Sequence, residues 1–316
     1  MKEKLKAIFA ASLTHQNRSV VHTPIQPFES LGSRSISLMV GSMLLVGCID
    51  SWEGPPHFLH VESFEIETTS EQGTSSSRIE EVWVYSETDV LGAFPLPADI
   101  PLSPDVLGST CELTLSAGIR ANAIAATRKP YPFYEALRHT MNLEFGGRDT
   151  LAIVRGYTDL TEVIIAEDFE LANRFQESNT STAQVVRTEN PEWVIEGLGS
   201  GLIELTAENS TLISMTNEQN FDLTTNGPVW LELNYACTQP FLIGLNISNA
   251  SSSQRTPILM LNSTSGDRNK IYLDLGPVVR TTPDATDYEI TLDASFDGSA
   301  DTTRVIVDNF KLLRYP

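Results

Sequence analysis

The segment Val229–Tyr235 carries the side chains best suited to hold a ligand. Successive residues of a strand point to opposite faces, so Trp230, Glu232 and Asn234 would share one face. The other face would carry Val229, Leu231, Leu233 and Tyr235. A sugar could stack its C–H face on the indole ring and bond its hydroxyls to the carboxylate and the amide. We therefore predict ligand binding at Trp230, Glu232 and Asn234. The alternative is that a loop or another module covers Trp230.

Cys48 offers a different chemistry, because its thiol could carry lipid. An apolar run, Ile36–Val46, follows Arg34. As a helix of about eleven residues it rises only about 16 Å, too short to span a membrane. It has the length of a signal-peptide apolar region.

The run ends in Leu45-Val46-Gly47-Cys48, which resembles the lipobox of bacterial lipoproteins. That resemblance implies cleavage before Cys48 and a stable membrane anchor of several acyl chains on its thiol. A short buried strand that ends in a core cysteine is the alternative. The stretch 1–33 is long for the region ahead of a signal sequence, which a true start downstream of Met1 would explain.

Charge and cysteine content narrow the classes of partner. The chain has a formal net charge of −20, and from Cys48 onward it holds 16 basic and 39 acidic residues. Such a field repels phosphate backbones, so we expect no nucleic-acid partner. The acidity serves solubility or, alternatively, cation binding. Cys111 and Cys237 each adjoin alternating apolar residues, and we predict two buried free thiols.

No catalytic motif is present. The sequence lacks a His-Glu-x-x-His zinc motif, a P-loop and a Gly-x-Ser-x-Gly elbow. His57, His60 and His139 have no neighbours of the metal-ligand type. A hydrolase or lyase would need paired carboxylates in one cleft, which sequence order cannot establish. We therefore predict a protein that is not an enzyme.

The strand pattern indicates an all-β protein with two sandwiches. We expect residues 1–47 to form a leader that is removed, and 48–57 a lipidated tether. About seven short strands in 58–158 predict an immunoglobulin-like or prealbumin-like antiparallel sandwich. The four prolines of 91–104 favour an edge strand or a crossing loop there. About nine strands in 161–316, with Trp193–Ile195 as one candidate, predict a jelly roll.

Several phrases resemble uncharacterised surface lipoproteins of Bacteroidota. The phrases are Phe94-Pro-Leu-Pro97, Glu112–Ile119 with Ala126–Phe133, Lys270–Leu275 and Asp308–Leu312, and the likeness extends over most of residues 55–316. By its strand rhythm and its closing Val-Asp-Asn-Phe strand, the second module also resembles carbohydrate-binding jelly rolls. That resemblance implies a structural calcium shared by the first and last strands, with Glu167, Asp168 and Asp308 as ligands. Solvated acidic residues are the alternative, and no other cofactor is expected.

These observations predict a lipid-anchored protein of the cell envelope, in the outer membrane, that binds a glycan without catalysis. The rival class is an accessory lipoprotein that docks onto an outer-membrane protein assembly. An exposed aromatic side chain in a groove would favour the glycan, and a broad apolar patch would favour the protein partner.

Overall fold

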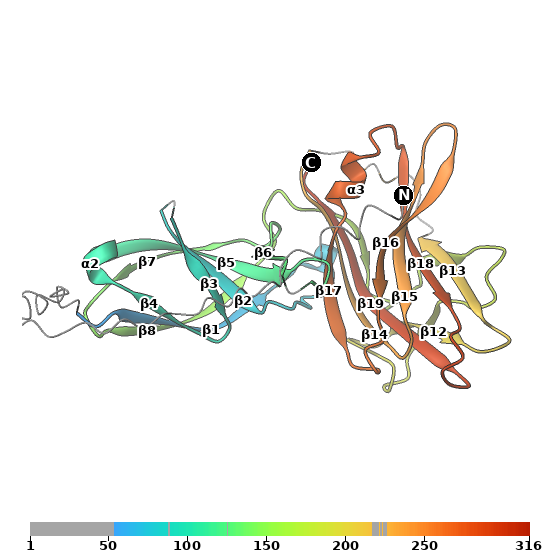
Figure 1. Cartoon of the computed structure of the whole chain (residues 1–316), viewed down its shortest axis with the longest axis horizontal. Coiled ribbons are helices and arrows are strands. Elements are labelled where there is room, and N and C mark those ends of the chain that lie inside the picture. The colour runs from blue at the N-terminus through green and yellow to red at the C-terminus, as the bar shows by residue number, and fades with distance from the viewer. Residues whose placement is uncertain (1–53, 88, 125, 217–220, 222, 224–225) are drawn as a thin grey trace, which may run out of the picture. The chain divides into compact units, whose positions relative to one another are not determined.

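The computed structural model describes residues 54–316 except 88, 125, 217–220, 222 and 224–225. Cys48 and the leader therefore lie outside the described residues. Gly54–Pro316 forms one compact unit. It is built from strands, as predicted, with three short helices in its described part (Figure 1). No helix among these residues is both long enough and apolar enough to cross a membrane.

The first module packs a three-stranded sheet, in the order β4-β1-β8, with a larger sheet in the order β3-β2-β5-β6. β7 pairs with another part of β5. Alternating buried side chains on β1 and β5, such as Leu59, Val61, Leu113 and Leu115, fill the space between the sheets. The elements are β1 (His57–Ile66), η1 (Ser70–Gln72), β2 (Glu81–Ser86), β3 (Asp89–Pro95), β4 (Ala98–Leu102), α2 (Pro104–Leu107), β5 (Thr110–Arg120), β6 (Arg128–Pro130), β7 (Leu137–Asn142) and β8 (Arg148–Arg155).

One strand pair of this module differs from the antiparallel sandwich predicted. β1 and β8 run parallel, with Phe58 opposite Arg148 and Ile66 opposite Arg155. Parallel pairing needs a long connection. Here that connection is the chain from β2 to β7, which comes between β1 and β8 in the sequence.

The proline-rich stretch behaves as predicted. Three of its four prolines lie in or between β3 and β4, each at the edge of its sheet, and the fourth, Pro104, begins α2. Edge positions tolerate proline because the missing N–H removes no bond from the interior of the sheet. The chain therefore crosses from the larger sheet to the smaller one at this point.

The second module is a sandwich of two sheets. One has the order β10-β13-β18-β15-β16, and the other has the order β11-β12-β19-β14-β17 with β9 also paired to β19. The predicted strand Trp193–Ile195 is wrong: the Trp193 N–H donates to the carbonyl of Asn190 in a turn. The elements are β9 (Glu162–Glu167), β10 (Phe175–Glu177), β11 (Val186–Thr188), β12 (Ser200–Leu205), β13 (Thr211–Thr216), β14 (Val229–Cys237), β15 (Phe241–Ser248), β16 (Ser253–Leu261), β17 (Asn269–Asp274), α3 (Gly276–Arg280), β18 (Asp287–Ser295) and β19 (Thr303–Arg314).

Each module has a cluster of buried apolar side chains, and one cluster crosses between them. The larger cluster lies between the sheets of the second module. The other belongs to the first module but includes Trp230, Tyr272 and Leu313 of the second. Cys111 and Cys237 are buried free thiols, which confirms that prediction.

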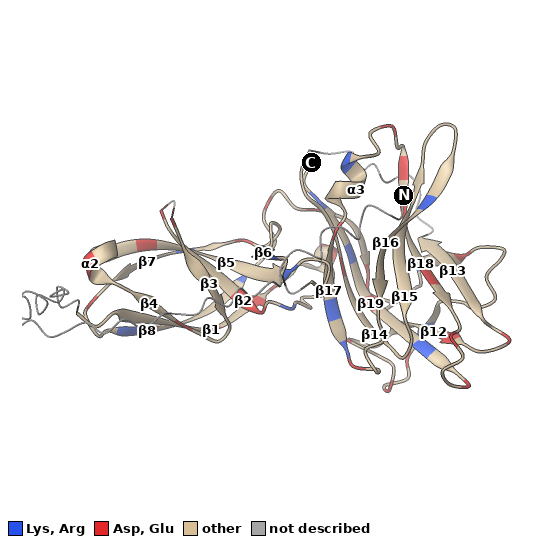
Figure 2. Ribbon diagram, viewed as in Figure 1, with Lys and Arg blue, Asp and Glu red and all other residues tan. Residues whose placement is uncertain are grey.

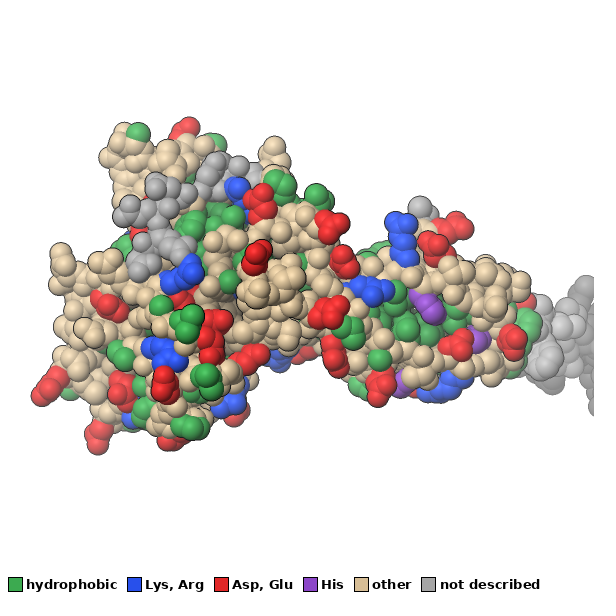
Figure 3. All heavy atoms as spheres, turned by 180° about the vertical axis from the view of Figure 1, so that it is seen from behind, with side chains coloured by type: hydrophobic (Ala, Val, Ile, Leu, Met, Phe, Trp, Pro, Cys, Tyr) green, Lys and Arg blue, Asp and Glu red, His purple; other side chains and the backbone are tan. Residues whose placement is uncertain are grey.

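Charged side chains are unevenly spread over the described residues. Acidic side chains are scattered over both modules, as the face seen in Figure 3 shows. Basic residues of both modules, Arg78, Arg120, Lys129 and Lys270, lie where β2, β5 and β6 approach β17, and Figure 2 shows basic ribbon positions there. The second module meets the first there.

Candidate functional site

The predicted faces of β14 are correct. Val229, Leu231, Leu233 and Tyr235 lie in the core of the second module. Trp230, Glu232 and Asn234 lie on the other face, beside Lys270 and Tyr272 of the paired strand β17. That face is not open: the exposed fractions of Trp230, Glu232 and Asn234 are 2%, 0% and 9%. A sugar cannot reach all three, so the open face that the ligand prediction requires is absent.

The first module covers Trp230, which is the alternative considered from the sequence. The ring of Tyr131 meets the indole edge to face at 5.3 Å between centroids. Lys129 Nζ lies 4.3 Å from the indole centroid. These contacts occupy the surface that a sugar would stack on. Only the margin of Trp230 reaches a hollow of about 330 Å³, between Pro130 and Arg280.

Glu232 is the centre of a buried polar network between the modules. Its Oε1 accepts hydrogen bonds from Tyr131 Oη at 2.9 Å and from Tyr157 Oη at 3.1 Å. Its Oε2 lies 3.0 Å from Lys270 Nζ. Lys311 Nζ donates to Tyr157 Oη at 3.2 Å. Both modules thus contribute to one set of charges that water does not reach.

The pKa values in this network follow from burial. Removal from water raises the pKa of Tyr131 well above its usual range, and the negative charge of Glu232 adds to that shift. Burial lowers the pKa of Lys311 to about 8, against the opposing attraction of Glu232. Asn234 donates from Nδ2 to Ser76 Oγ at 2.7 Å. Glu232 and Asn234 are thus occupied by contacts within the protein, and their role in the described residues is structural.

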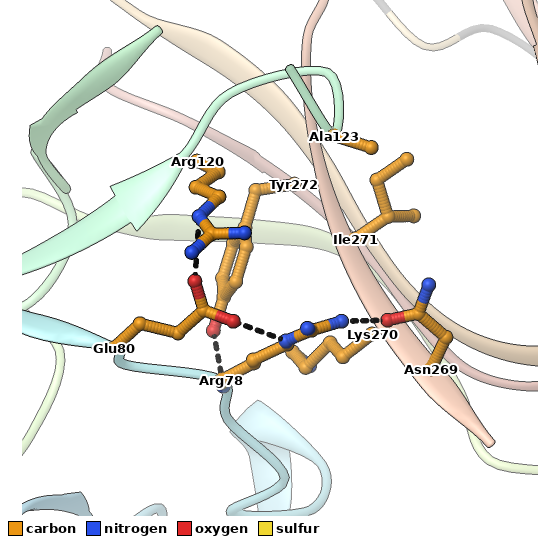
Figure 4. A pocket seen from close by; sticks show the side chains of 8 residues that line it. All are labelled: Arg78, Glu80, Arg120, Ala123, Asn269, Lys270, Ile271 and Tyr272. Carbon is orange, nitrogen blue, oxygen red and sulfur yellow. Dashed lines mark hydrogen bonds and ion pairs between the residues drawn. The ribbon is translucent and has the colours of Figure 1, made fainter. Parts of the chain in front are cut away.

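An open pocket lies beside this network, and we call it the junction pocket. It is a hollow of about 170 Å³ with side chains from both modules in its wall (Figure 4). Its lining residues are Arg78, Glu80, Arg120, Ala123, Asn269, Lys270, Ile271 and Tyr272.

Strand pairing places the acidic and basic groups of this pocket. Glu81 is opposite Gly118 in the β2–β5 ladder, so Glu80, just before β2, lies close to Arg120 at the end of β5. Arg120 Nε is 2.6 Å from Glu80 Oε2. Arg78 Nε donates to Glu80 Oε1 at 2.8 Å, and Arg78 also donates to Asn269 of the second module. Glu80 thus holds two guanidinium groups at the mouth of the hollow.

A tight turn fixes the far wall of the pocket. Asn122 and Ala123 adopt φ values of 54° and 56°, a left-handed conformation that asparagine tolerates better than most residues. The Asn122 N–H donates to the carbonyl of Tyr272 at 2.8 Å, and the Asp274 N–H donates to Asn122 Oδ1 at 3.0 Å. β17 is at the edge of its sheet, and the turn occupies part of that edge.

The predicted calcium ligands do not form a metal site. The Oε1 and Oε2 atoms of Glu167 accept hydrogen bonds from the amides of Phe169 and Arg174, at 2.7 and 2.9 Å. Asp308 accepts from Ser200 Oγ at 2.8 Å and from the Asn309 amide. Asp168 accepts from the Glu170 amide. Among the described residues no three His, Cys, Asp or Glu side chains group together in a way that could hold a metal ion. The prediction is wrong because backbone and hydroxyl donors already serve these carboxylates.

Asp308 is nevertheless unusual. Its side chain is fully buried, and burial raises its pKa to about 7. The charge of Glu196 also raises it, while the hydrogen bond from Ser200 lowers it. The carboxyl group therefore changes its charge near neutral pH, and no ion pair to it is found among the residues that the structure describes.

Sequence reasoning missed the residues of the junction pocket. Arg78, Glu80, Arg120 and Asn269 lie at strand ends or next to them, where charged side chains are ordinary. Nothing in their spacing indicates that residues 191 positions apart, such as Arg78 and Asn269, are in contact. The one available signal concerned Trp230 and not the pocket: the basic and aromatic run Arg128–Tyr134 contains Lys129 and Tyr131, which cover it.

No family model matches this chain, and no curated protein matches it. Among solved structures, it is similar to a xylan-binding domain of carbohydrate-binding module family 22, with 13% identity over 48% of this chain and 94% of that chain, at a TM-score of 0.32. A variant of a family 29 carbohydrate-binding module matches at 13% identity over 48% and 91%, with a TM-score of 0.31. Carbohydrate-binding modules of the β-sandwich superfamily match at 14% identity over 73% and 84%, with a TM-score of 0.33. Likeness at this level supports neither a shared ligand nor a shared site.

Proposed function

We propose that this protein is a non-catalytic glycan-binding protein that holds its ligand in the junction pocket. One observation carries the proposal: polar side chains of two modules converge on an open hollow of about 170 Å³. Arg78, Glu80 and Arg120 come from the first module and Asn269 from the second. Ligand sites commonly lie between domains, with a few polar groups that fix orientation.

The lining residues favour binding over hydrolysis. Glycoside hydrolysis ordinarily uses two carboxylates on opposite sides of the scissile bond. Among the residues that line the pocket, Glu80 is the single carboxylate, and both of its oxygens are held by guanidinium groups. Two arginines thus occupy the oxygens that a catalytic carboxylate would need for a proton or a water molecule.

The proposal includes a lipid anchor at Cys48 and a place in the cell envelope, in the outer membrane. Its support is the sequence Leu45-Val46-Gly47-Cys48 behind an apolar run. A glycan-binding protein held at the membrane would retain soluble glycan near the cell or hold the cell to a glycan surface.

A glycan array with the whole protein in detergent tests the binding proposal. We expect at least one glycan to bind and its signal to fall at least tenfold in Asn269→Ala, which removes a side chain from the pocket wall. Asn262→Ala is the matched control, since Asn262 is an exposed asparagine outside the pocket. Equal binding by both variants and the parent would place the glycan elsewhere and end the assignment of this pocket.

Docking onto a membrane protein is the second candidate function, and one observation favours it. Leu171 and Leu198 are 96% and 74% exposed. Their loops are joined because the Leu198 amide donates to Glu170 Oε1 at 2.8 Å. Exposed leucines on adjacent loops suit a protein partner. Leu171→Asp with Leu198→Asp should abolish crosslinking to an envelope protein if this role is real and leave it unchanged if it is not.

A further inference from the structure

The side-chain charges of the junction pocket are opposite in sign to those of the chain as a whole. The protein has a net charge of −20, yet the pocket is lined by Arg78, Arg120 and Lys270 against a single carboxylate, Glu80. Such a hollow attracts anionic groups at short range, because salt screens the distant acidic residues.

Arg120 has donors to spare at this position. An arginine offers five N–H donors in a planar fork. In the described part of the chain, the side chain of Arg120 makes one ion pair, from Nε to Glu80. Figure 4 places its guanidinium group in the wall of the pocket, next to the Glu80 carboxylate and beside the ring of Tyr272. Its terminal nitrogens are therefore available to a planar anion, which arginine binds through two parallel hydrogen bonds.

Lys270 provides a second, independent observation. Its side chain is 4% exposed, and its Nζ lies 3.0 Å from Glu232 Oε2. This contact is not aligned as a hydrogen bond, and Lys270 Nζ has no other hydrogen-bond partner among the described residues. An ammonium carries three donors, and buried donors without partners cost free energy. An anion in the pocket would supply an acceptor.

We infer that the junction pocket takes the acidic group of a glycan, as the carboxylate of a uronic acid or the sulfate ester of a sulfated sugar. The inference rests on the proposed glycan-binding function and names its ligand class. Arg120 would bind the oxyanion through its free N–H groups. The buried ammonium group of Lys270 would attract the same oxyanion electrostatically. Arg78 would remain engaged with Glu80 and Asn269, where it links the modules.

Calorimetry of the whole protein in detergent tests this inference with three probes: trigalacturonate, its methyl ester and a sulfated galactan oligosaccharide. We expect one of the two acidic probes to bind at low salt and the methyl ester to bind at least tenfold more weakly. Preference for trigalacturonate would assign the carboxylate, and preference for the sulfated probe would assign the sulfate ester. Affinity for the acidic probe should fall as sodium chloride is raised.

Arg120→Gln should lower the affinity for the acidic probe at least tenfold. Arg148→Gln is the matched control, because Arg148 also pairs with a carboxylate, that of Asp99, but lies outside the pocket; its affinity should stay within twofold of the parent. If neither acidic probe binds more tightly than the methyl ester, or if the Arg120→Gln affinity equals that of the parent, the acidic class is overturned. If neutral glycans then still bind in a manner that depends on Asn269, the proposed function survives. If no glycan of either kind depends on Asn269, the proposed function fails as well.

Discussion

Glu232 Oε2 and Lys270 Nζ lie 3.0 Å apart on adjacent strands, with side chains that are 0% and 4% exposed. Removing one member of a buried pair is costly, because the other charge stays out of water without its partner. Here two ammonium groups depend on the same carboxylate, since Lys311 is also attracted to Glu232.

The first prediction concerns this pair. Glu232→Gln should lower the free energy of unfolding by about 3–5 kcal/mol, measured by guanidinium denaturation at pH 7. Glu204→Gln, which breaks a solvent-exposed pair with Arg304, should cost less than about 1 kcal/mol. Similar losses in the two variants would show that the buried network contributes no more than a surface ion pair.

Trp230 is the subject of the second prediction. Because it is buried under Tyr131 and Lys129, Trp230→Ala should cost about 3–5 kcal/mol. Trp193→Ala, at a half-buried indole that contacts Arg304, should cost clearly less. Melting curves of both variants measure the difference. If Trp230→Ala were as stable as the parent, Trp230 would be on an open face, and the prediction that it stacks on a sugar would stand again.

The third prediction is a pH dependence that comes from Asp308. Its pKa in the folded protein is about 7, above the usual value of about 3.9 for an unfolded chain. The folded state therefore binds the proton more tightly between these two values, and the contribution of Asp308 to stability falls as pH rises from about 4 to 7. Carbon-13 NMR of its carboxyl group should show a midpoint near 7, while that of the exposed Asp297, whose pKa its contacts with Ser299 lower, should lie below the usual value. A midpoint near 4 for Asp308 would contradict the prediction.

The fourth prediction addresses the modules. Residues 161–316 contain the larger apolar cluster, so expressed alone they should unfold in one cooperative transition. Loss of the first module would expose Trp230, Tyr272 and Leu313, and the melting temperature should fall by roughly 5–10 °C relative to the whole protein. Calorimetry measures both. A fragment that never folds would mean that the modules form one indivisible core.

The fifth prediction is lipidation. Cys48→Ala should leave the leader uncleaved at this position and remove labelling by fatty-acid analogues, because the proposed lipid would be attached through this thiol. Cys111→Ala should keep the label, since that thiol is buried in the first module. Intact mass of the mature protein is the measurement. A mature N-terminus elsewhere without acyl mass would refute the anchor.

Local pattern predicted the faces of strands but not what covers them. The alternation in β14 correctly separates Leu231 from Trp230. A polar and aromatic face looks the same in sequence whether it meets solvent or another module, and Tyr131 lies 101 residues from the Glu232 that it contacts. The buried faces of β1 and β5 could be predicted from their alternating apolar residues, because a strand in one of two packed sheets buries every second side chain.

The predicted metal site failed for a different reason. The strands are adjacent as expected, since Glu167 is opposite Phe310 in the β9–β19 ladder. The carboxylate of Glu167, however, accepts hydrogen bonds from the amides of the turn that follows it. The sequence does not show which donors will form hydrogen bonds with an acidic side chain. The junction pocket could not be foreseen because its wall is made by two modules whose docking depends on contacts far apart in the chain.

The parallel pairing of β1 and β8 has a mechanical consequence. The chain enters the first module at the His57 end of β1 and leaves it from the Arg155 end of β8, at opposite ends of the paired strands. Tension between the N-terminal side and the second module would load the whole β1–β8 ladder in shear, so its hydrogen bonds would share the force instead of opening one by one. The first module is thereby built to resist extension between its two chain ends.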